Sequence, residues 1–249
     1  MKRVLYLVVF TMIFFSVNAQ KADILLPSKM DRETLINHLG YSLSYNSGYV
    51  MPSWVAYKVT KVQINGDSKV KEKYQPDPAV TTRSATKKDY RDCGYVMAQL
   101  VNYNDLRQNP DAAEETFYMS NIVPMKLAFY NHVWLKTEEL IRLWTADNDG
   151  LYVVDGPVLA DGPFPTFSDD KIAIPRRYYK AVYDPKNQKA VGFIFTNGTA
   201  SGTLKSYAMS IDALEKEIGI DLFPSLNDEN GKKIEAEYNP DDWNFELVK

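Results

Sequence analysis

The sequence predicts an α+β fold in which a central antiparallel β-sheet is flanked by helices. Several short segments alternate between apolar and polar residues, which is typical of strands, whereas few segments have helical spacing. The two kinds of segment do not alternate regularly, so a parallel sheet of strand–helix–strand units is not indicated. Hydrophobic residues make up 45% of the chain, enough for a substantial core in one domain.

The chain begins with the features of a secretion signal. Lys2 and Arg3 precede an apolar run, and Val17-Asn18-Ala19 offers residues of the size that a signal peptidase reads. The run is shorter than the roughly 20 residues that a membrane-spanning helix needs. We therefore expect residues 1–19 to be a cleaved signal peptide, and the protein to be secreted or periplasmic with no membrane span.

Charge and cysteine content limit the function classes. Removal of the signal takes away two basic residues and no acidic ones, so the formal net charge changes from −3 to −5. A mildly acidic protein has no global attraction for a polyanion, and only a local basic patch can bind one. Cys93 is the only cysteine, which excludes an intramolecular disulfide.

The expected strands follow an N-terminal arm at residues 20–37. Residues 65–90 carry Gly, Pro and many charges, which predicts an irregular surface excursion. The alternating segments predict strands at 41–45 and 54–59, joined in a hairpin around 46–48; at 151–154 and 171–175; and at 178–183 and 190–195, joined in a second hairpin.

Two helices are expected in the second half of the chain. Residues 134–146 contain strong helix formers without Gly or Pro, and Gly150 ends the segment. Residues 211–218 are amphipathic and stop at Gly219. Residues 111–115 are a short helix or a loop. The polar tail at 227–249 need not be ordered, although Trp243 and Phe245 are able to pack onto the core.

Few side chains are suited to acid–base chemistry. His38 and His132 are the only histidines, and each is expected to be a structural or surface residue. The sequence has no HExxH, paired CxxC, phosphate-loop or GxSxG motif, so the corresponding hydrolase classes lack support. Glu138 and Arg142 have the i,i+4 spacing at which a helix-surface ion pair forms.

Several stretches carry a family resemblance. They include Gly-Tyr-Ser-Leu-Ser-Tyr-Asn at 40–46, Trp-Val-Ala-Tyr at 54–57, Phe-Tyr-Met-Ser-Asn-Ile at 117–122, the helix at 134–142, and Gly-Ile-Asp-Leu-Phe-Pro at 219–224. Over residues 38–226 the chain resembles the DNA/RNA non-specific endonucleases of the ββα-metal type, the secreted Serratia nuclease family. This resemblance implies a ββα-metal nuclease-like domain.

The resemblance fails at the residues that carry the family's chemistry. In the family, Gly-Tyr is followed by a DRGH motif whose histidine is the general base. Here Gly94-Tyr95 is followed by Val96, Met97, Ala98 and Gln99, so Gln99 occupies the histidine position. The spacing to Ser120-Asn121 fits the family without a gap. The resemblance implies that six residues line the cleft: Val96, Met97, Ala98, Asn121, Asn131 and His132.

The family's metal-binding asparagine is also replaced. Ungapped counting places Tyr130 at the ligand position, followed by Asn131 and His132 where Arg and Gly are expected. A slip of one residue would let Asn131 act as the ligand. Glu138 and Arg142 match the family's supporting glutamate and the arginine near the scissile phosphate.

These replacements suggest a nuclease fold without nuclease chemistry. An amide is not a useful base near pH 7, and a neutral phenol is a poor ligand for Mg²⁺. The leading hypothesis is a secreted, catalytically inactive pseudonuclease that needs no cofactor and binds a nucleic acid, a protein or a glycan. One alternative is an active Mg²⁺-dependent endonuclease with His132 as the base and Asn131 or Glu138 holding the ion. The other is a cell-envelope interaction protein with no nucleic-acid role.

Overall fold

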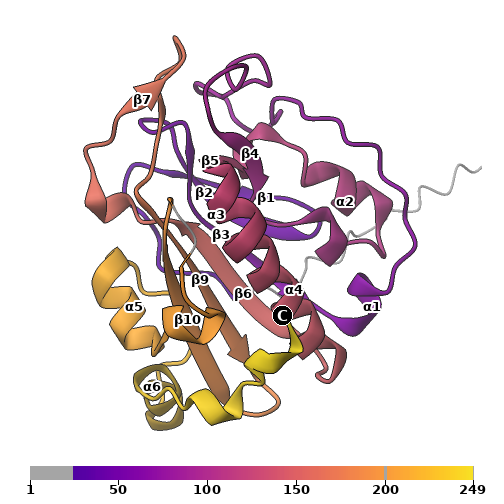
Figure 1. The fold of residues 1–249 in the computed structure, drawn as a ribbon, viewed down its shortest axis with the longest axis vertical. Coiled ribbons are helices and arrows are strands. Elements are labelled where there is room, and N and C mark those ends of the chain that lie inside the picture. The colour runs from indigo at the N-terminus through magenta and orange to yellow at the C-terminus, as the bar shows by residue number, and fades with distance from the viewer. Residues whose placement is uncertain (1–24, 199–200, 249) are drawn as a thin grey trace, which may run out of the picture.

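A seven-stranded antiparallel sheet runs through the protein (Figure 1). The structure is a computed structural model that describes residues 25–198 and 201–248, so the expected signal peptide lies outside the described residues. In sheet order the strands are β1 (Thr34–Asn37), β2 (Tyr41–Asn46), β3 (Met51–Val59), β6 (Leu151–Pro157), β9 (Arg177–Asp184), β10 (Lys189–Thr196) and β11 (Ala208–Met209). The predicted fold class is therefore confirmed.

Each face of the sheet is covered by helices, because successive side chains of a strand point to opposite faces. In β3, Val55 and Tyr57 belong to one hydrophobic cluster, whereas Trp54 and Ala56 belong to the other. Helix α4 (Leu135–Ala146) packs on the first face. Helices α5 (Ile211–Ile218) and α6 (Glu229–Ala236) pack on the second (Figure 1).

Local sequence signals account for the elements that were expected. Both hairpins form, as β2–β3 and β9–β10. Helix α5 occupies the predicted residues, because the Ser210 hydroxyl accepts a hydrogen bond from the Ala213 amide and Gly219 takes the left-handed φ of 73° that ends the helix. Residues 171–175 form only the short strand β8 (Ile172–Ala173), paired with β7 (Thr166–Phe167).

Short helical segments connect these strands. They are α1 (Lys61–Ile64), η1 (Tyr103–Asp105), α2 (Pro110–Glu115), η2 (Met119–Asn121), α3 (Leu127–Phe129), η4 (Leu159–Asp161) and η5 (Leu204–Tyr207). Helix α2 is the segment that the sequence left open between helix and loop. It begins with Pro110 and is capped by the Asn109 side chain. Residues 65–90 contain no helix and no strand, only turns and an isolated bridge at Gln75, in agreement with the expected excursion.

Helices and turns also form in the polar C-terminal tail. After α6 come η6 (Pro240–Asp242) and η7 (Phe245–Leu247). Trp243 is 3% exposed, and its ring centroid lies 4.6 Å from that of Trp144. The Trp144 indole donates a hydrogen bond to the carbonyl of Asn244 at 3.0 Å. The tail therefore packs onto the core, as its two aromatic residues allow.

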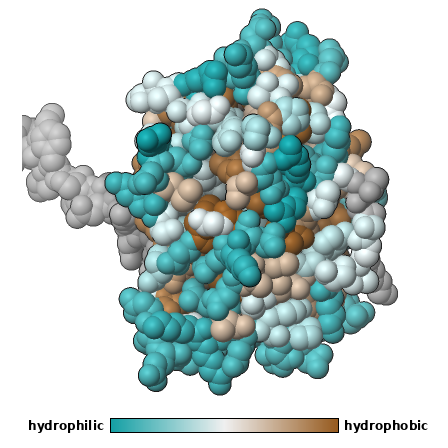
Figure 2. Space-filling view, turned by 90° about the vertical axis from the view of Figure 1, so that its left-hand side faces the viewer, coloured by the Kyte–Doolittle hydropathy of each residue, from teal (hydrophilic) through white to brown (hydrophobic). Residues whose placement is uncertain are grey.

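The surface on the α5 and α6 side is dominated by hydrophilic side chains, with hydrophobic atoms exposed between them (Figure 2). Within the two described ranges, none of the helices has the length and hydrophobicity required to cross a membrane.

Candidate functional site

A second, two-stranded sheet holds the residues that were expected to carry chemistry. Strand β4 (Val96–Gln99) pairs antiparallel with β5 (Ile122–Met125), and the pairing sets Gln99 opposite Ile122. The chain then passes through α3 and the π-helical turn η3 (Tyr130–Trp134) into α4. Two strands followed by a helix thus form one unit that contains the expected site residues. Strands β4 and β5 were not predicted from the sequence.

Gln99, at the general-base position, points into the protein. Its side-chain amide donates hydrogen bonds to the Thr116 carbonyl at 3.0 Å and to the Thr116 hydroxyl at 2.9 Å. The residue is only 6% exposed. A carboxamide has no basicity near neutral pH, and these two bonds commit its N–H groups to the protein. The Gln99 side chain therefore connects β4 to the end of α2 through hydrogen bonds.

Four of the six expected cleft residues lie on or beside β4 and β5, and they divide into two groups. Val96 and Met97 are half-buried, whereas Ala98 and Asn121 are fully buried. The Asn121 amide donates to the carbonyls of Val101 and Thr116, and its oxygen accepts from the Val101 amide at 3.0 Å. Because these bonds engage both ends of the Asn121 amide, the structure differs from the expected cleft position: Ala98 and Asn121 belong to the packed interior.

Tyr130 occupies the metal-ligand position as a neutral phenol. Burial and the nearby carboxylates of Glu138 and Glu72 raise the pKa of Tyr130 to about 12. The side chain is half-buried against the first hydrophobic cluster. It lies at the start of the π-helical turn η3. Such turns occur frequently at functional sites.

His132 and Asn131 are exposed on this turn. His132 lines a cavity of about 470 Å³ with Lys136, Lys205 and residues of the C-terminal segment. Glu138 lies six residues later, in α4. Its carboxylate faces Asn102, so His132 and Glu138 meet different parts of the protein.

Glu138 and Arg142 bind different partners rather than each other. The Glu138 Oε2 atom accepts a hydrogen bond from the Asn102 amide at 2.9 Å, and Glu138 is 2% exposed. Among the described residues, its Oε1 atom has no hydrogen-bond partner. An Arg142 Nη atom lies 2.9 Å from the Asp105 carboxylate. The i,i+4 ion pair suggested by their spacing is thus replaced by contacts to the η1 segment.

A fully buried ion pair lies in the same region. The Lys180 Nζ is 2.5 Å from the Asp155 Oδ2 and 3.8 Å from the ring centroid of Trp134. The Trp134 indole donates to the backbone carbonyl of Gln99 at 3.3 Å. Sequence reasoning missed this cluster. The sequence does contain a signal for it, because each of two apolar strands carries one charged residue. Unpaired charges are rarely buried, so two such residues indicate an ion pair.

Burial also changes the protonation of these carboxyl groups. Desolvation raises the pKa of Glu138 to about 8, with Lys180 opposing the shift and Asp105 adding to it. Burial likewise raises the pKa of Asp155, against the favourable field of Lys180. Burial therefore favours the neutral form of the Glu138 carboxyl group.

The residues present do not fit a Mg²⁺ ion. Mg²⁺ prefers ionised carboxylate, carbonyl and water oxygens in octahedral geometry. The expected ligand position carries the phenol of Tyr130, and Glu138 is buried, has a raised pKa and is bonded to Asn102. Gln99 directs its amide at Thr116. None of these three side chains therefore offers an ionised, accessible oxygen to the ion.

The other histidine anchors the irregular excursion beside this region. His38 Nε2 lies 3.0 Å from Asp77 Oδ2, and the Ser120 hydroxyl donates to the same oxygen at 2.6 Å. The carboxylate, not the imidazole, contacts the hydroxyl, so the cluster lacks the order of a serine-hydrolase triad. Nearby, Gln75 exchanges backbone hydrogen bonds with Phe117 and Met119. His38 is structural, as expected.

The Glu138 protonation generates a pH-dependent prediction. A carboxyl group with a raised folded-state pKa contributes stability that is complete below its unfolded pKa, about 4.5, and is lost as the pH rises to about 8. Glu138→Gln imitates the protonated group and cannot titrate. We expect equal stability to wild type near pH 4.5 and a gain on the order of 2–4 kcal/mol at pH 8. Urea unfolding across this range measures it.

Glu139→Gln is the matched control, because Glu139 is the exposed neighbour on the same helix. Its stability profile should follow that of wild type at every pH. If Glu138→Gln also followed wild type, the buried carboxyl would have to be ionised in the folded protein at neutral pH, contrary to the prediction.

Proteins named as nucleases match most of this chain. Nuclease EXOG, mitochondrial, from Danio rerio is 29% identical over 208 residues, which cover 76% of this chain and 60% of that protein. Nuclease C1 from Cunninghamella echinulata var. echinulata is 26% identical over 205 residues, covering 75% and 81%. Nuclease from Serratia marcescens is 26% identical over 216 residues, covering 79% and 77%. The chain spans about 60% of the length of the EXOG relatives that it matches.

A solved structure shares the fold. The crystal structure of the EndoG/EndoGI complex, which addresses the mechanism of EndoG inhibition, aligns with a TM-score of 0.71 and 22% identity, covering 78% of this chain and 86% of that chain. The family model for DNA/RNA non-specific endonuclease matches residues 26–229. The chain therefore belongs to the DNA/RNA non-specific endonuclease family.

Proposed function

We propose that this protein is a non-catalytic member of its nuclease family, a pseudonuclease whose role is to bind. The observation that carries the proposal is the direction of Gln99, whose amide is bonded to Thr116 in the interior. A family nuclease needs a base at this position, and here the side chain neither accepts a proton nor faces a substrate.

The expected loss of rate is large. General-base assistance contributes roughly 10²–10⁴-fold in ordinary enzymes. Metal stabilisation of a phosphodiester transition state adds several kcal/mol. Gln99 cannot provide the first contribution, and the phenol of Tyr130 with the protonated Glu138 does not support the second. These deficits act on the same reaction, so together they favour an inactive protein.

The geometry gives less support to an active enzyme with a rearranged site. Such a site requires His132 as the base close to an ion held by Asn131 or Glu138. His132 instead lines the cavity beside Lys136 and Lys205, while the Glu138 carboxylate is bonded to Asn102. The proposed base and ligand therefore face different surroundings.

A cleavage assay tests the proposal that the protein is catalytically inactive. We expect purified protein, incubated with plasmid DNA or with RNA in Mg²⁺ or Mn²⁺, to match the buffer background. Gln99→Ala and Glu138→Ala should give the same result, because neither side chain performs chemistry. Robust cleavage that is lost in either variant but retained in Glu139→Ala would overturn the proposal.

Nucleic acid is the partner that the surface beside β4 and α3 favours. Two lysines there lie over tyrosine rings: Lys126 Nζ is 4.0 Å from the ring centroid of Tyr95, and Lys87 Nζ is 5.8 Å from that of Tyr74. Tyr95 precedes β4, and Lys126 precedes α3. Exposed ammonium groups suit the phosphates of a nucleic acid.

This assignment predicts salt-dependent binding to a single-stranded oligonucleotide. We expect the double variant Lys87→Gln/Lys126→Gln to bind more weakly and to lower the slope of log affinity against log salt by about 1–2, because two phosphate contacts are lost. Fluorescence anisotropy at several salt concentrations measures both. Lys216→Gln/Lys232→Gln, on the far face of the sheet, is the control. Absence of salt-dependent binding would favour the interaction protein with no nucleic-acid role.

We also propose that the protein is exported after cleavage of residues 1–19. The basic start, the apolar run and Val17-Asn18-Ala19 support this proposal. Mass spectrometry of the protein recovered outside the cytoplasm should find Gln20 at the N-terminus. Recovery of the protein only from the cytoplasm, with residues 1–19 retained, would contradict export.

A further inference from the structure

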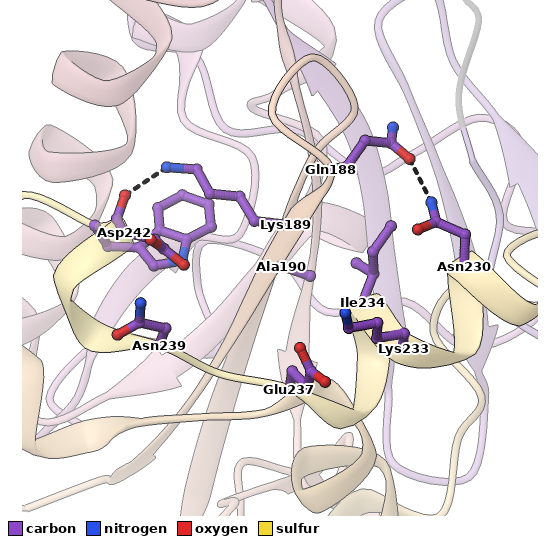
Figure 3. A pocket seen from close by; sticks show the side chains of 10 residues that line it. Gln188, Lys189, Ala190, Asn230, Lys233, Ile234, Glu237, Asn239 and Asp242 are labelled. Carbon is purple, nitrogen blue, oxygen red and sulfur yellow. Dashed lines mark hydrogen bonds between the residues drawn. The ribbon is translucent and has the colours of Figure 1, made fainter.

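A polar cavity of about 220 Å³ lies between the β9–β10 hairpin and the C-terminal segment (Figure 3). Its walls come from the start of β10, from α6 and from η6. All of its lining residues on α6 and η6 follow residue 229, where the match to the nuclease family ends. The cavity therefore depends on a segment that the family match does not include.

The walls of this cavity are held in place by packing. Ile234 is buried in the cluster on one face of the sheet, and Trp243 is buried in the cluster on the other face. Residues 235–242 connect these two anchors. Ala190 supplies a small, buried side chain between them, which leaves the space open (Figure 3).

Two of the polar side chains at the rim are already engaged. The Lys189 ammonium donates to the Asp242 carbonyl at 2.5 Å and lies 4.3 Å from the Trp243 ring centroid. The Gln188 amide oxygen accepts from Asn230 at 2.7 Å, and its nitrogen donates to the Pro185 carbonyl at 2.6 Å. These contacts fix the positions of Gln188 and Lys189 before any ligand arrives.

Three charged side chains in the lining, those of Lys233, Glu237 and Asp242, have no ion pair or side-chain hydrogen bond among the described residues. All three are exposed. Lys233 lies on α6 and Glu237 directly follows the helix, and the ends of both side chains project toward the cavity in Figure 3. No ion pair joins them within the described part of the chain, although i,i+4 spacing permits one. The cavity thus offers a free ammonium and a free carboxylate to one small ligand.

We propose that this cavity binds a small zwitterion, a free α-amino acid. Lys233 takes the carboxylate of the ligand, and Glu237 takes its ammonium group. The volume of the cavity is about that of seven molecules of liquid water, which suits a small amino acid. A sugar fits the lining less well, because Trp243 is buried and Lys189 lies over its ring, so no aromatic face is open for stacking.

Titration calorimetry with glycine, L-alanine and L-serine tests the proposal. We expect at least one of these amino acids to bind, and its N-acetyl and amide derivatives to bind at least about tenfold more weakly, since each lacks one charge. Lys233→Gln and Glu237→Gln should each weaken binding by a similar factor. Lys232→Gln, an exposed neighbour on α6 that does not line the cavity, should stay within about twofold of wild type.

The fold of each variant is checked by its melting temperature, and Ala190→Leu provides a second route by filling the space without changing charge. Loss of binding in Ala190→Leu with an unchanged melting temperature would support the site. No heat signal up to about 10 mM amino acid, equal affinity for the blocked derivatives, or binding of glucose in preference to amino acids would each overturn it.

Discussion

The buried ion pair between Lys180 and Asp155 is the interaction on which the site region depends. An ammonium group without water is very unfavourable unless a carboxylate and further contacts replace its solvation. Asp155 supplies that charge from β6, and the Lys180 ammonium also lies over the ring of Trp134 at the start of α4. Because Trp134 also bonds to the carbonyl of Gln99, two strands of the large sheet, the long helix and β4 are held in one arrangement.

Three of the expected site residues are bonded within the protein. Gln99 donates to Thr116, the Glu138 Oε2 atom accepts from Asn102, and Arg142 pairs with Asp105. Buried polar groups that are hydrogen-bonded add to stability, whereas polar groups left without a partner in the interior reduce it. Gln99 and Glu138 therefore form part of the packed interior.

Local signals predicted much of the fold. Alternation over Tyr41 to Tyr45 predicted β2, and the amphipathic run that stops at Gly219 predicted α5. Strands β1, β4 and β5 escaped prediction because each is only four residues long. In addition, β4 and β5 pair with each other across a long stretch of sequence. The replaced site residues could be located by spacing within a known family. Their new partners could not, since Thr116, Asn102 and Asp105 meet them only through the tertiary fold.

The C-terminal segment touches both hydrophobic layers, through Ile234 on one side and Trp243 on the other. Removal of this segment would take away the ring that packs on Trp144 on one face and a buried side chain beside the start of β10 on the other. A chain truncated before residue 234 would therefore expose apolar surface on both sides of the sheet at once, which favours aggregation.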